Sequence, residues 1–257
     1  MEFSPVICAS LATSPRSAQA PMLSRARALR YSRVMALTIA RYFAKAILWF
    51  VGITLLLVIA FKWLPVPVTA TMLMDENGAT RDWESLDNID RNLVSAVIAA
   101  EDSRFCEHFG FDTEAIEQAM RENAEGGRIR GGSTISQQTA KNVFLWQGGG
   151  YFRKGLEAWF TFWIEAVWGK RRIMEVYLNV AETGIGTYGA EAGSQRYFGH
   201  STARMSADEA SRMAAALPSP KTRAVKSPGG WLGRHGNRIE RRIRIVRRDG
   251  LDACVYK

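Results

Sequence analysis

The apolar positions of this chain follow two different patterns, separated by Pro65 and Pro67. Residues 46–61 form an apolar run without a charge, and the residues that follow extend it close to the roughly 20 residues that a bilayer requires. Beyond the prolines, which break a helix, apolar residues recur between polar ones with a helical period. The pattern predicts one transmembrane helix, residues 46–64, and a mainly helical domain after it.

Caps, breaks and turn residues delimit the individual elements of that domain. Asp90 is placed to cap a helix over Leu93–Ala100. Val68–Met74 is predicted as a short strand closed by a turn, and Glu182–Gly189 as a Gly-rich loop. The remaining predicted helices cover Thr113–Glu125, 153–168, 170–179, Ala207–Leu217 and Trp231–Arg248.

The net charge of +9 is concentrated beside the predicted span. Residues 1–45 hold seven of the 34 Lys and Arg residues and a single acid, Glu2. This placement weakens the interpretation of the overall positive charge as a sign of nucleic-acid binding. It predicts that the N-terminus lies in the cytoplasm and that the residues after about 66 lie outside it. A cleavable signal peptide is the alternative, but Lys-Trp-Leu-Pro-Val-Pro is a poor cleavage site.

The first 34 residues are rich in Ser, Ala and Arg and poor in acids. This composition resembles a transit peptide and equally fits a disordered cytoplasmic tail. A translation start at Met22 or Met35 rather than Met1 is a third interpretation. The three cysteines, Cys8, Cys106 and Cys254, have no paired or metal-ligand spacing, so the sequence implies no disulfide framework.

Candidate chemistry concentrates where the predicted helix over residues 93–100 ends. Glu101 and Asp102 adjoin there, and Arg104, Glu107 and His108 follow within two turns. The helix dipole disfavours negative charge at the C-terminal end of a helix, so the presence of two adjacent acids there requires an explanation. One reason is catalysis, because a carboxylate at the mouth of a cleft acts as a general base or acid. The alternative is a solvated helix end, and spacing alone does not decide between them.

Three further segments carry candidate binding residues. Gly131-Gly132 precede hydroxyl and amide side chains up to Asn142, at a helix start that suits an anion, with a capped surface helix as the alternative. Arg153 and Glu157 share a helix face and either pair with each other or serve a ligand. The basic C-terminal helix either presents a solvated cationic face or contacts anionic lipid.

Taken together and in this order, the segments of residues 85–222 resemble the family 51 glycosyltransferases, the peptidoglycan polymerases. The matching motifs are Glu101-Asp102-x-x-Phe105-x-x-His108-x-Gly110, Gly131-Gly-Ser-Thr-Ile-Ser-Gln-Gln-x-x-Lys141-Asn142, Arg153-Lys154-x-x-Glu157, Lys170-x-x-Ile173-x-Glu175-x-Tyr177-Leu-Asn179 and Leu217-Pro218-x-Pro220. One such motif alone is weak evidence for the resemblance, whereas five motifs in this order behind a membrane anchor are specific to the family. The departures are small: Ser136 stands where Thr is usual, and Cys106 occupies a variable position.

The resemblance implies a mainly α, lysozyme-like, two-lobed glycosyltransferase domain behind a single N-terminal transmembrane helix. No transpeptidase activity is expected, because no serine has a lysine three positions on and few residues follow Pro220. The expected organisation is a largely disordered, basic cytoplasmic tail (1–45), a transmembrane helix (46–64), a linker with a short strand (65–84), the glycosyltransferase domain (85–222) and a basic C-terminal helical extension (223–257).

The family reaction joins lipid-linked disaccharide-peptide units, lipid II, into a β-1,4 glycan and releases undecaprenyl diphosphate from the growing chain. The attacking hydroxyl needs a base, and the resemblance assigns that role to Glu101. The anionic leaving group needs cations and N–H donors rather than a proton.

The resemblance also implies a set of substrate-binding residues: Asp102, Phe105, His108, Ser133, Thr134, Gln138, Lys141, Asn142, Arg153 and Lys154. Within this set Asp102 and His108 are expected to act as supports. Glu157, the second catalytic carboxylate, is expected to orient Arg153 or Lys141, or to hold a divalent ion against the diphosphate.

No cofactor is expected to be required for the chemistry, although a divalent cation, Mg or Mn, would suit the diphosphate. The expected partners are lipid II with the growing glycan chain, the inner membrane, and cell-division or cell-wall synthesis proteins, without nucleic acid. The expected location is the cell inner membrane, single-pass, with a cytoplasmic N-terminus and a periplasmic catalytic domain.

A lipid-linked substrate requires catalysis near the bilayer surface. Apolar residues near 143–151 are therefore expected to dip into the headgroup region as a mobile flap, namely Val143, Phe144, Leu145 and Trp146. Two alternative functions stay open. A lytic transglycosylase or muramidase-like enzyme cuts glycan and has no use for Lys141 and Arg153, and a non-catalytic cell-wall scaffold makes no glycan product.

Overall fold

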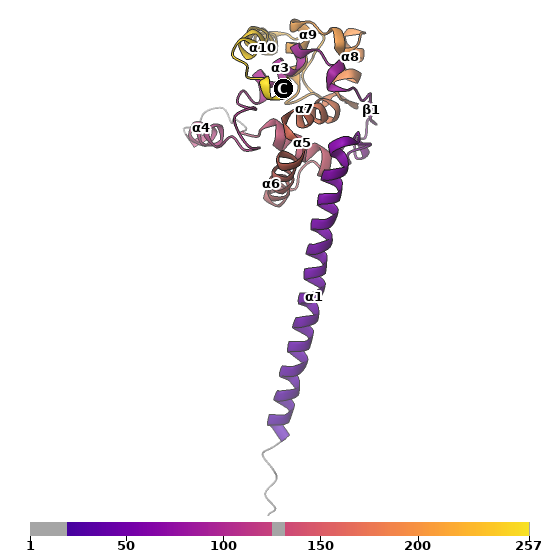
Figure 1. Cartoon of the computed structure of the whole chain (residues 1–257), viewed down its shortest axis with the longest axis vertical. Helices are drawn as coiled ribbons and strands as arrows, with labels where there is room; N and C mark the ends of the chain where they lie inside the picture. The colour runs from indigo at the N-terminus through magenta and orange to yellow at the C-terminus, as the bar shows by residue number, and fades with distance from the viewer. Residues whose placement is uncertain (1–19, 125–131, 257) are drawn as a thin grey trace, which may run out of the picture. The chain divides into compact units, whose positions relative to one another are not determined.

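The computed structural model describes residues 20–124 and 132–256. These residues fall into two compact units, one ending at Ile53 and the other beginning at Thr54 (Figure 1). Helix α1 (Ala20–Trp63) continues from the first unit into the second. The second unit contains all the other elements and every candidate site residue that the sequence indicates between residues 101 and 157.

Helix α1 is longer than the predicted span. Its stretch Arg30–Trp63 is the one helical segment of the described residues that is long and apolar enough to cross a membrane. Residues 20–45 are helical, which corrects the expectation of a largely disordered tail for that part. Ala, Leu, Met and Arg favour a helix, and an existing helix extends into such sequence more readily than a new one starts. The rest of the expected tail, residues 1–19, lies outside the described residues.

The last turns of α1 are held against the domain by side chains that donate to its backbone. Trp168 donates its indole N–H to the carbonyl oxygen of Val58 at 2.6 Å. Arg172 donates to the carbonyl oxygens of Phe61 at 2.9 Å and Leu64 at 2.6 Å. Because the last four carbonyls of a helix lack partners within the helix, the donation from Arg172 to Phe61 satisfies a group that would otherwise need water.

The predicted strand Val68–Met74 is wrong, because its centre is a helical turn, α2 (Ala70–Leu73). Thr69 has an extended backbone, and its hydroxyl accepts the N–H of Met72, which caps the turn. The local cap outweighs the β-branched residues that suggested a strand. The strand of this region comes later, as β1 (Thr80–Arg81).

A small three-stranded sheet of order β1-β3-β2 replaces the predicted loop Glu182–Gly189. Its other strands are β2 (Glu182–Gly184) and β3 (Thr187–Tyr188). Strand β3 pairs antiparallel with β2 and parallel with β1. The turn requires glycine at Gly186, where φ is +61° and a Cβ would lie 2.9 Å from the carbonyl oxygen of Asn77.

The rest of the domain is mainly helical, as predicted. In chain order the elements are η1 (Leu86–Asn88), α3 (Arg91–Glu101), α4 (Thr113–Ala124), α5 (Ile135–Phe144), α6 (Gly150–Val167), α7 (Gly169–Val180), α8 (Ala190–Phe198), η2 (Thr202–Arg204), α9 (Ala207–Ala216), α10 (Gly230–Arg248) and α11 (Ala253–Tyr256). Helix α3 packs against α9 and α10, and α5 packs against α6 and α7, which gives two helical groups (Figure 1). The candidate site lies where the end of α3 meets α5.

The basic C-terminal helix, α10, is part of this packing rather than a separate extension. Its predicted apolar stripe, Ile239, Ile243 and Val246, is buried in the core. The arginines on its other faces are exposed. An amphipathic helix of this kind is stabilised by the area that its apolar stripe buries.

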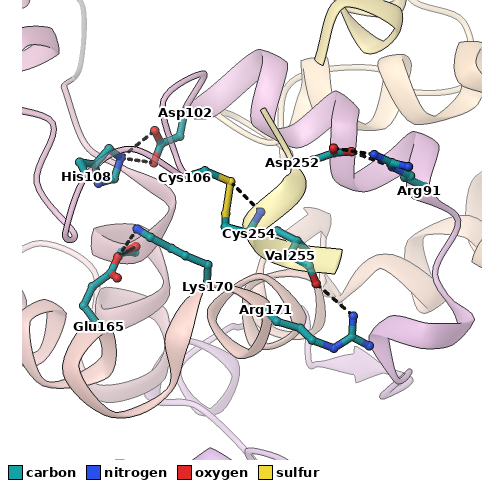
Figure 2. The surroundings of a disulfide bond; sticks show 11 residues. Arg91, Asp102, Cys106, His108, Glu165, Lys170, Arg171, Asp252, Cys254 and Val255 are labelled. Atoms are coloured by element: carbon teal, nitrogen blue, oxygen red, sulfur yellow. Dashed lines mark hydrogen bonds and ion pairs between the residues drawn. A yellow bond between two sulfur atoms is a disulfide. The ribbon is translucent and has the colours of Figure 1, made fainter. Parts of the chain in front are cut away.

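A disulfide joins Cys106 to Cys254, which corrects the expectation that no disulfide framework exists (Figure 2). The two cysteines are 148 residues apart in sequence, with a Cα–Cα distance of 5.5 Å. Spacing rules detect cysteines that are close in sequence or arranged in repeated pairs, and neither applies here. Cys8 lies outside the described residues.

Candidate active site

Glu101 is the last residue of α3, and its position follows from how that helix is built. Asp90 caps the helix by accepting the N–H of Asn92 at 2.7 Å, as predicted. The residues from Leu93 to Ala99 are buried, so the helix is fixed in the core and its final residue emerges at the edge. The carboxylate of Glu101 accepts a hydrogen bond from the amide of Gln138, on α5, at 2.9 Å.

Burial raises the pKa of Glu101, although its side chain keeps some exposed surface. The hydrogen bond from Gln138 and the charges of Arg223 and Lys141 oppose this rise, while the charge of Asp102 adds to it. A solvated helix end would show no such enclosure, so the catalytic interpretation of this acid is favoured over that alternative. A carboxylate with a raised pKa is a stronger base once it is ionised.

Asp102, next to Glu101, is buried and fixes the start of α5. One of its oxygens accepts the backbone N–H of Ile135 at 3.0 Å, and the carboxylate pairs with Nε2 of His108 at 3.0 Å (Figure 2). A carboxylate at a helix N-terminus is favoured by the dipole and by the unpaired N–H groups there. Both residues therefore act as supports for the site.

Phe105 is enclosed in the core and presents no surface to a substrate, which corrects its assignment as a substrate-binding residue. Its side chain is 0% exposed and belongs to the core. The ammonium group of Lys170 lies 4.6 Å from the centre of its ring and also pairs with Glu165 at 2.6 Å. Phe105 therefore fills the core beneath the loop that follows Glu101.

The start of α5 is a buried capping box rather than the surface helix that was the alternative. Thr134 accepts the N–H of Gln137, and the Gln137 side chain accepts the N–H of Thr134. The Thr134 hydroxyl also donates to the carbonyl oxygen of Gly110 at 2.7 Å. Gly110 has φ +78°, and a Cβ there would lie 2.7 Å from Cγ2 of Thr161, so this motif position requires glycine. Gly131 lies outside the described residues.

Glu157 is nearly fully buried, 3% exposed, and both of its carboxylate oxygens pair with cations. Arg153 donates to one oxygen at 2.7 Å, and the ammonium of Lys154 pairs with the other. Lys154 also donates to the hydroxyl of Ser133 at 3.0 Å, which links α6 to the start of α5. The predicted pairing of Arg153 with Glu157 is confirmed. These contacts match the expected orienting role of Glu157 toward Arg153.

Lys141 lies among these charges without a close partner of its own. Among the described residues none forms a hydrogen bond or an ion pair with its ammonium group within 4.0 Å. Burial lowers the pKa of Lys141; the charge of Glu157 opposes this, and those of Arg153 and Lys154 add to it. Glu101 also acts on it. Asn142 follows on the same helix and is half-buried.

A pocket of about 290 Å³ opens between the end of α3, helix α4 and the start of α5. Glu101, Asp102, Ser133 and Thr134 line it, whereas Lys141, Arg153 and Glu157 do not. Glu101 therefore lines this pocket and also interacts through its charge with Lys141, one of the three cations around Glu157. The arrangement suits a base that serves one substrate while cations hold the leaving group of another.

Two arginines near Glu101 were not found from the sequence. Arg242, on α10, lines the pocket and donates to the carbonyl oxygen of Ala99 at 3.3 Å. Arg223 acts on Glu101 through its charge and donates to the carbonyl oxygen of Ala215 at 2.7 Å. Both come from the basic C-terminal part of the chain, where many arginines are present and nothing in the pattern distinguishes these two.

A mainly helical domain with a half-buried carboxylate near a group of cations is compatible with a group-transfer enzyme. Comparison with known proteins gives the family: residues 68–247 match the family described as Transglycosylase. The chain belongs to this transglycosylase family, and it is a glycosyltransferase.

Similar proteins share most of their length with this chain. Three of them are each named as a biosynthetic peptidoglycan transglycosylase. The one from Caulobacter vibrioides is 52% identical over 201 residues, 77% of this chain and 88% of that protein. The one from Rhodospirillum centenum is 49% identical over 211 residues, 79% and 91% of the two chains. The one from Pseudomonas syringae pv. syringae is 45% identical over 216 residues, 80% and 92%.

Proposed function

We propose that this enzyme polymerises lipid II into β-1,4 glycan strands and releases undecaprenyl diphosphate. The names of its relatives support the peptidoglycan substrate. The observation that carries the proposal is that Glu101 lines a pocket and interacts through its charge with Lys141, which belongs with Arg153 and Lys154 to a cluster of three cations. A polymerase needs a base for the acceptor and a cationic site for the leaving diphosphate.

In the proposed reaction Glu101 takes the proton from the attacking sugar hydroxyl of the acceptor. The new bond forms between that oxygen and the anomeric carbon of the donor, and the bond from this carbon to the diphosphate oxygen breaks. The electron pair leaves with the diphosphate, which is already anionic and needs no proton. Lys141 and Arg153 stabilise the charge that develops on it, and Glu157 keeps Arg153 and Lys154 in place.

The domain also carries an aromatic surface suited to the membrane interface. Tyr151 and Phe152, at the start of α6, are 98% and 74% exposed. Farther along the helix Phe162 is also exposed, and its ring lies 6.1 Å from that of the exposed Phe109. Exposed aromatic residues in such numbers are typical of surfaces that enter the headgroup region. We propose that this surface keeps the site at the depth of a lipid-linked substrate.

The residues that were expected to form the flap do not have this role. Val143 and Leu145 are buried, and Phe144 and Trp146 pack against the same core. Phe144 stacks on Phe160 with ring centres 4.4 Å apart. The expectation is wrong because Val143 and Phe144 continue α5, whose apolar side faces α6 and α7.

We also propose that the protein is anchored in the inner membrane, with its N-terminus in the cytoplasm and its catalytic domain in the periplasm. The excess of basic residues before the apolar helix supports this orientation. The disulfide between Cys106 and Cys254 supports an oxidising compartment for the domain.

The direct test incubates the purified full-length protein with labelled lipid II in the presence and absence of EDTA. The proposal predicts a polymer that muramidase digests. The comparison with and without EDTA tests separately whether the divalent cation expected at the diphosphate is needed for polymerisation. Cleavage of pre-formed glycan without polymer would favour the lytic alternative, and the absence of any product would favour the scaffold.

A further inference from the structure

Residues 252–255, close to the end of the described residues, form a short segment that is called the C-terminal clasp here. Asp252 is 0% exposed, accepts two hydrogen bonds from Arg91 at 2.8 and 2.7 Å, and accepts a third from Ser95 at 3.0 Å. The buried Val255 accepts a hydrogen bond from Arg171, on α7, at 3.1 Å (Figure 2). These contacts fix the segment to α3 and α7.

The clasp holds the chain on both sides of Glu101. Before Glu101, its Asp252 binds the first two turns of α3 through Arg91 and Ser95. After Glu101, its Cys254 forms the disulfide with Cys106 and donates its backbone N–H toward the same sulfur at 3.3 Å (Figure 2). The two ends of the stretch that carries Glu101 are thus tied to one short segment.

The loop that contains Cys106 is also the loop that fixes α5. On one side of the cysteine, Asp102 accepts the N–H of Ile135. On the other side, the carbonyl oxygen of Gly110 accepts the hydroxyl of Thr134. Because α5 carries Gln138 and Lys141, a displacement of this loop moves both residues relative to Glu101. Reactions of this kind lose rate steeply when reacting groups shift by about 1 Å.

We propose that the disulfide between Cys106 and Cys254 is a positioning device for Glu101, and that the enzyme reaches full activity only when the clasp is closed by it. Formation of the bond removes two protons and two electrons from the two thiols. The acceptor is the disulfide of a thiol–disulfide exchange partner, which is reduced to a dithiol in the process. This inference rests on the proposed polymerase function.

The test compares oxidised full-length protein with a variant in which both cysteines are replaced, Cys106→Ser with Cys254→Ser. Polymerisation of labelled lipid II is measured in membranes or detergent, with kcat and KM determined separately. The expected result is a fall in kcat of about 10- to 100-fold with a smaller change in KM. Cys8→Ser is the matched control, since it removes the third cysteine and is expected to keep the wild-type rate.

A pH profile distinguishes positioning from general loss of folded protein. The groups that act on Glu101 are Gln138, Arg223, Asp102 and Lys141, and burial dominates among their effects. With the clasp open, Glu101 is expected to be better solvated, so that the acid limb of kcat moves to lower pH. Loss of folded enzyme would lower the rate at every pH and leave this limb in place.

Reduction of the wild-type protein gives the same comparison where the double variant does not fold. Dithiothreitol opens the disulfide and is itself oxidised to its cyclic disulfide, and reoxidation should restore the rate. Equal kcat and an unchanged acid limb in the oxidised and reduced proteins would overturn the inference while leaving the polymerase proposal intact. If oxidised wild-type protein makes no polymer, the proposed function fails instead.

Discussion

The ionisation of Glu101 and Lys141 determines the pH range in which the proposed chemistry operates. Burial raises the pKa of Glu101 above the usual 4.5 and lowers that of Lys141 below 10.5. The base works when Glu101 has lost its proton, and the diphosphate site works while Lys141 keeps its own. Polymerisation should therefore follow a bell-shaped pH profile in which both limbs lie closer to neutral pH than those of exposed Glu and Lys. An acid limb at the usual carboxylate pH would contradict the enclosure of Glu101.

Removal of the Lys141 charge should lower turnover far more than stability. Lys141 has no ion pair with the described residues to lose, so Lys141→Ala should change the free energy of unfolding by less than about 1 kcal/mol. Its proposed role in stabilising the leaving diphosphate predicts a fall in kcat of about 100-fold or more. The measurement compares polymerisation rate with melting temperature, and Arg204→Ala, an exposed arginine on η2, is the charge-matched control.

Arg153→Ala should differ from Lys141→Ala in a specific way. It also removes one of the two cations that pair with the buried Glu157, so it should lower the melting temperature as well as kcat. Equal melting temperatures for the two variants would show that the pairing of Arg153 with Glu157 adds nothing to stability.

At the scale of single residues, the structure brings together most of the side chains that the sequence motifs indicated. Glu101, Gln138 and Lys141 lie close together because the end of α3 faces α5. The assignment of Phe105 as a substrate-binding residue was wrong, because a motif position indicates that a residue matters but does not indicate whether its side chain is exposed. Arg223 and Arg242 were missed because their roles depend on how the C-terminal segment packs, which local pattern does not encode.

At the scale of elements, helix α5 depends on the cap at its start. Thr134→Val removes the hydroxyl that accepts from Gln137 and donates to Gly110, so it should destabilise the protein by about 1–2 kcal/mol. Thr134→Ser keeps the hydroxyl and should retain most of that stability, which makes it the matched control. Chemical denaturation measures both. A valine variant as stable as the serine variant would show that the capping box contributes little.

Element boundaries were predictable where a cap or a period marked them. Asp90 and the apolar stripe of α10 are examples, and both helices begin within a few residues of the prediction. The strand prediction for Val68–Met74 was wrong because Thr69 favours both a strand and a helix cap. Its hydrogen bond with the N–H of Met72 stabilises the cap. Strands β2 and β3 are too short for an alternating pattern to show, and their pairing with β1 depends on distant residues.

At the scale of the whole molecule, the aromatic surface of α6 should matter only when the substrate lies in a bilayer. Tyr151→Ser with Phe152→Ser should lower the rate on full-length lipid II in vesicles and leave the rate on a short-chain, water-soluble analogue unchanged. Ile185→Ser replaces an exposed apolar residue of the β2–β3 turn and is the control. Equal losses with both substrates would place these residues in the chemistry rather than at the membrane.

The disulfide shows best what the sequence alone could not reveal. Cys106 and Cys254 come together only when α11 reaches α7 and the loop after α3 lies beside it. That contact is a product of the complete fold, and a sequence separation of 148 between the cysteines gives no sign of it. The apolar helix and the helical class, by contrast, follow from composition and period within short windows.

The most direct test of the central claim, that Glu101 is the base, is polymerisation of lipid II by Glu101→Gln, with lipid II binding measured on the same sample. Glutamine keeps the size of the side chain and an oxygen that can accept from Gln138. Since the raised pKa of Glu101 means that the folded protein loses stability as pH rises through that pKa, the variant should melt no lower than wild type at neutral pH. The account predicts intact binding and no polymer, and near-wild-type polymerisation by this variant would contradict it.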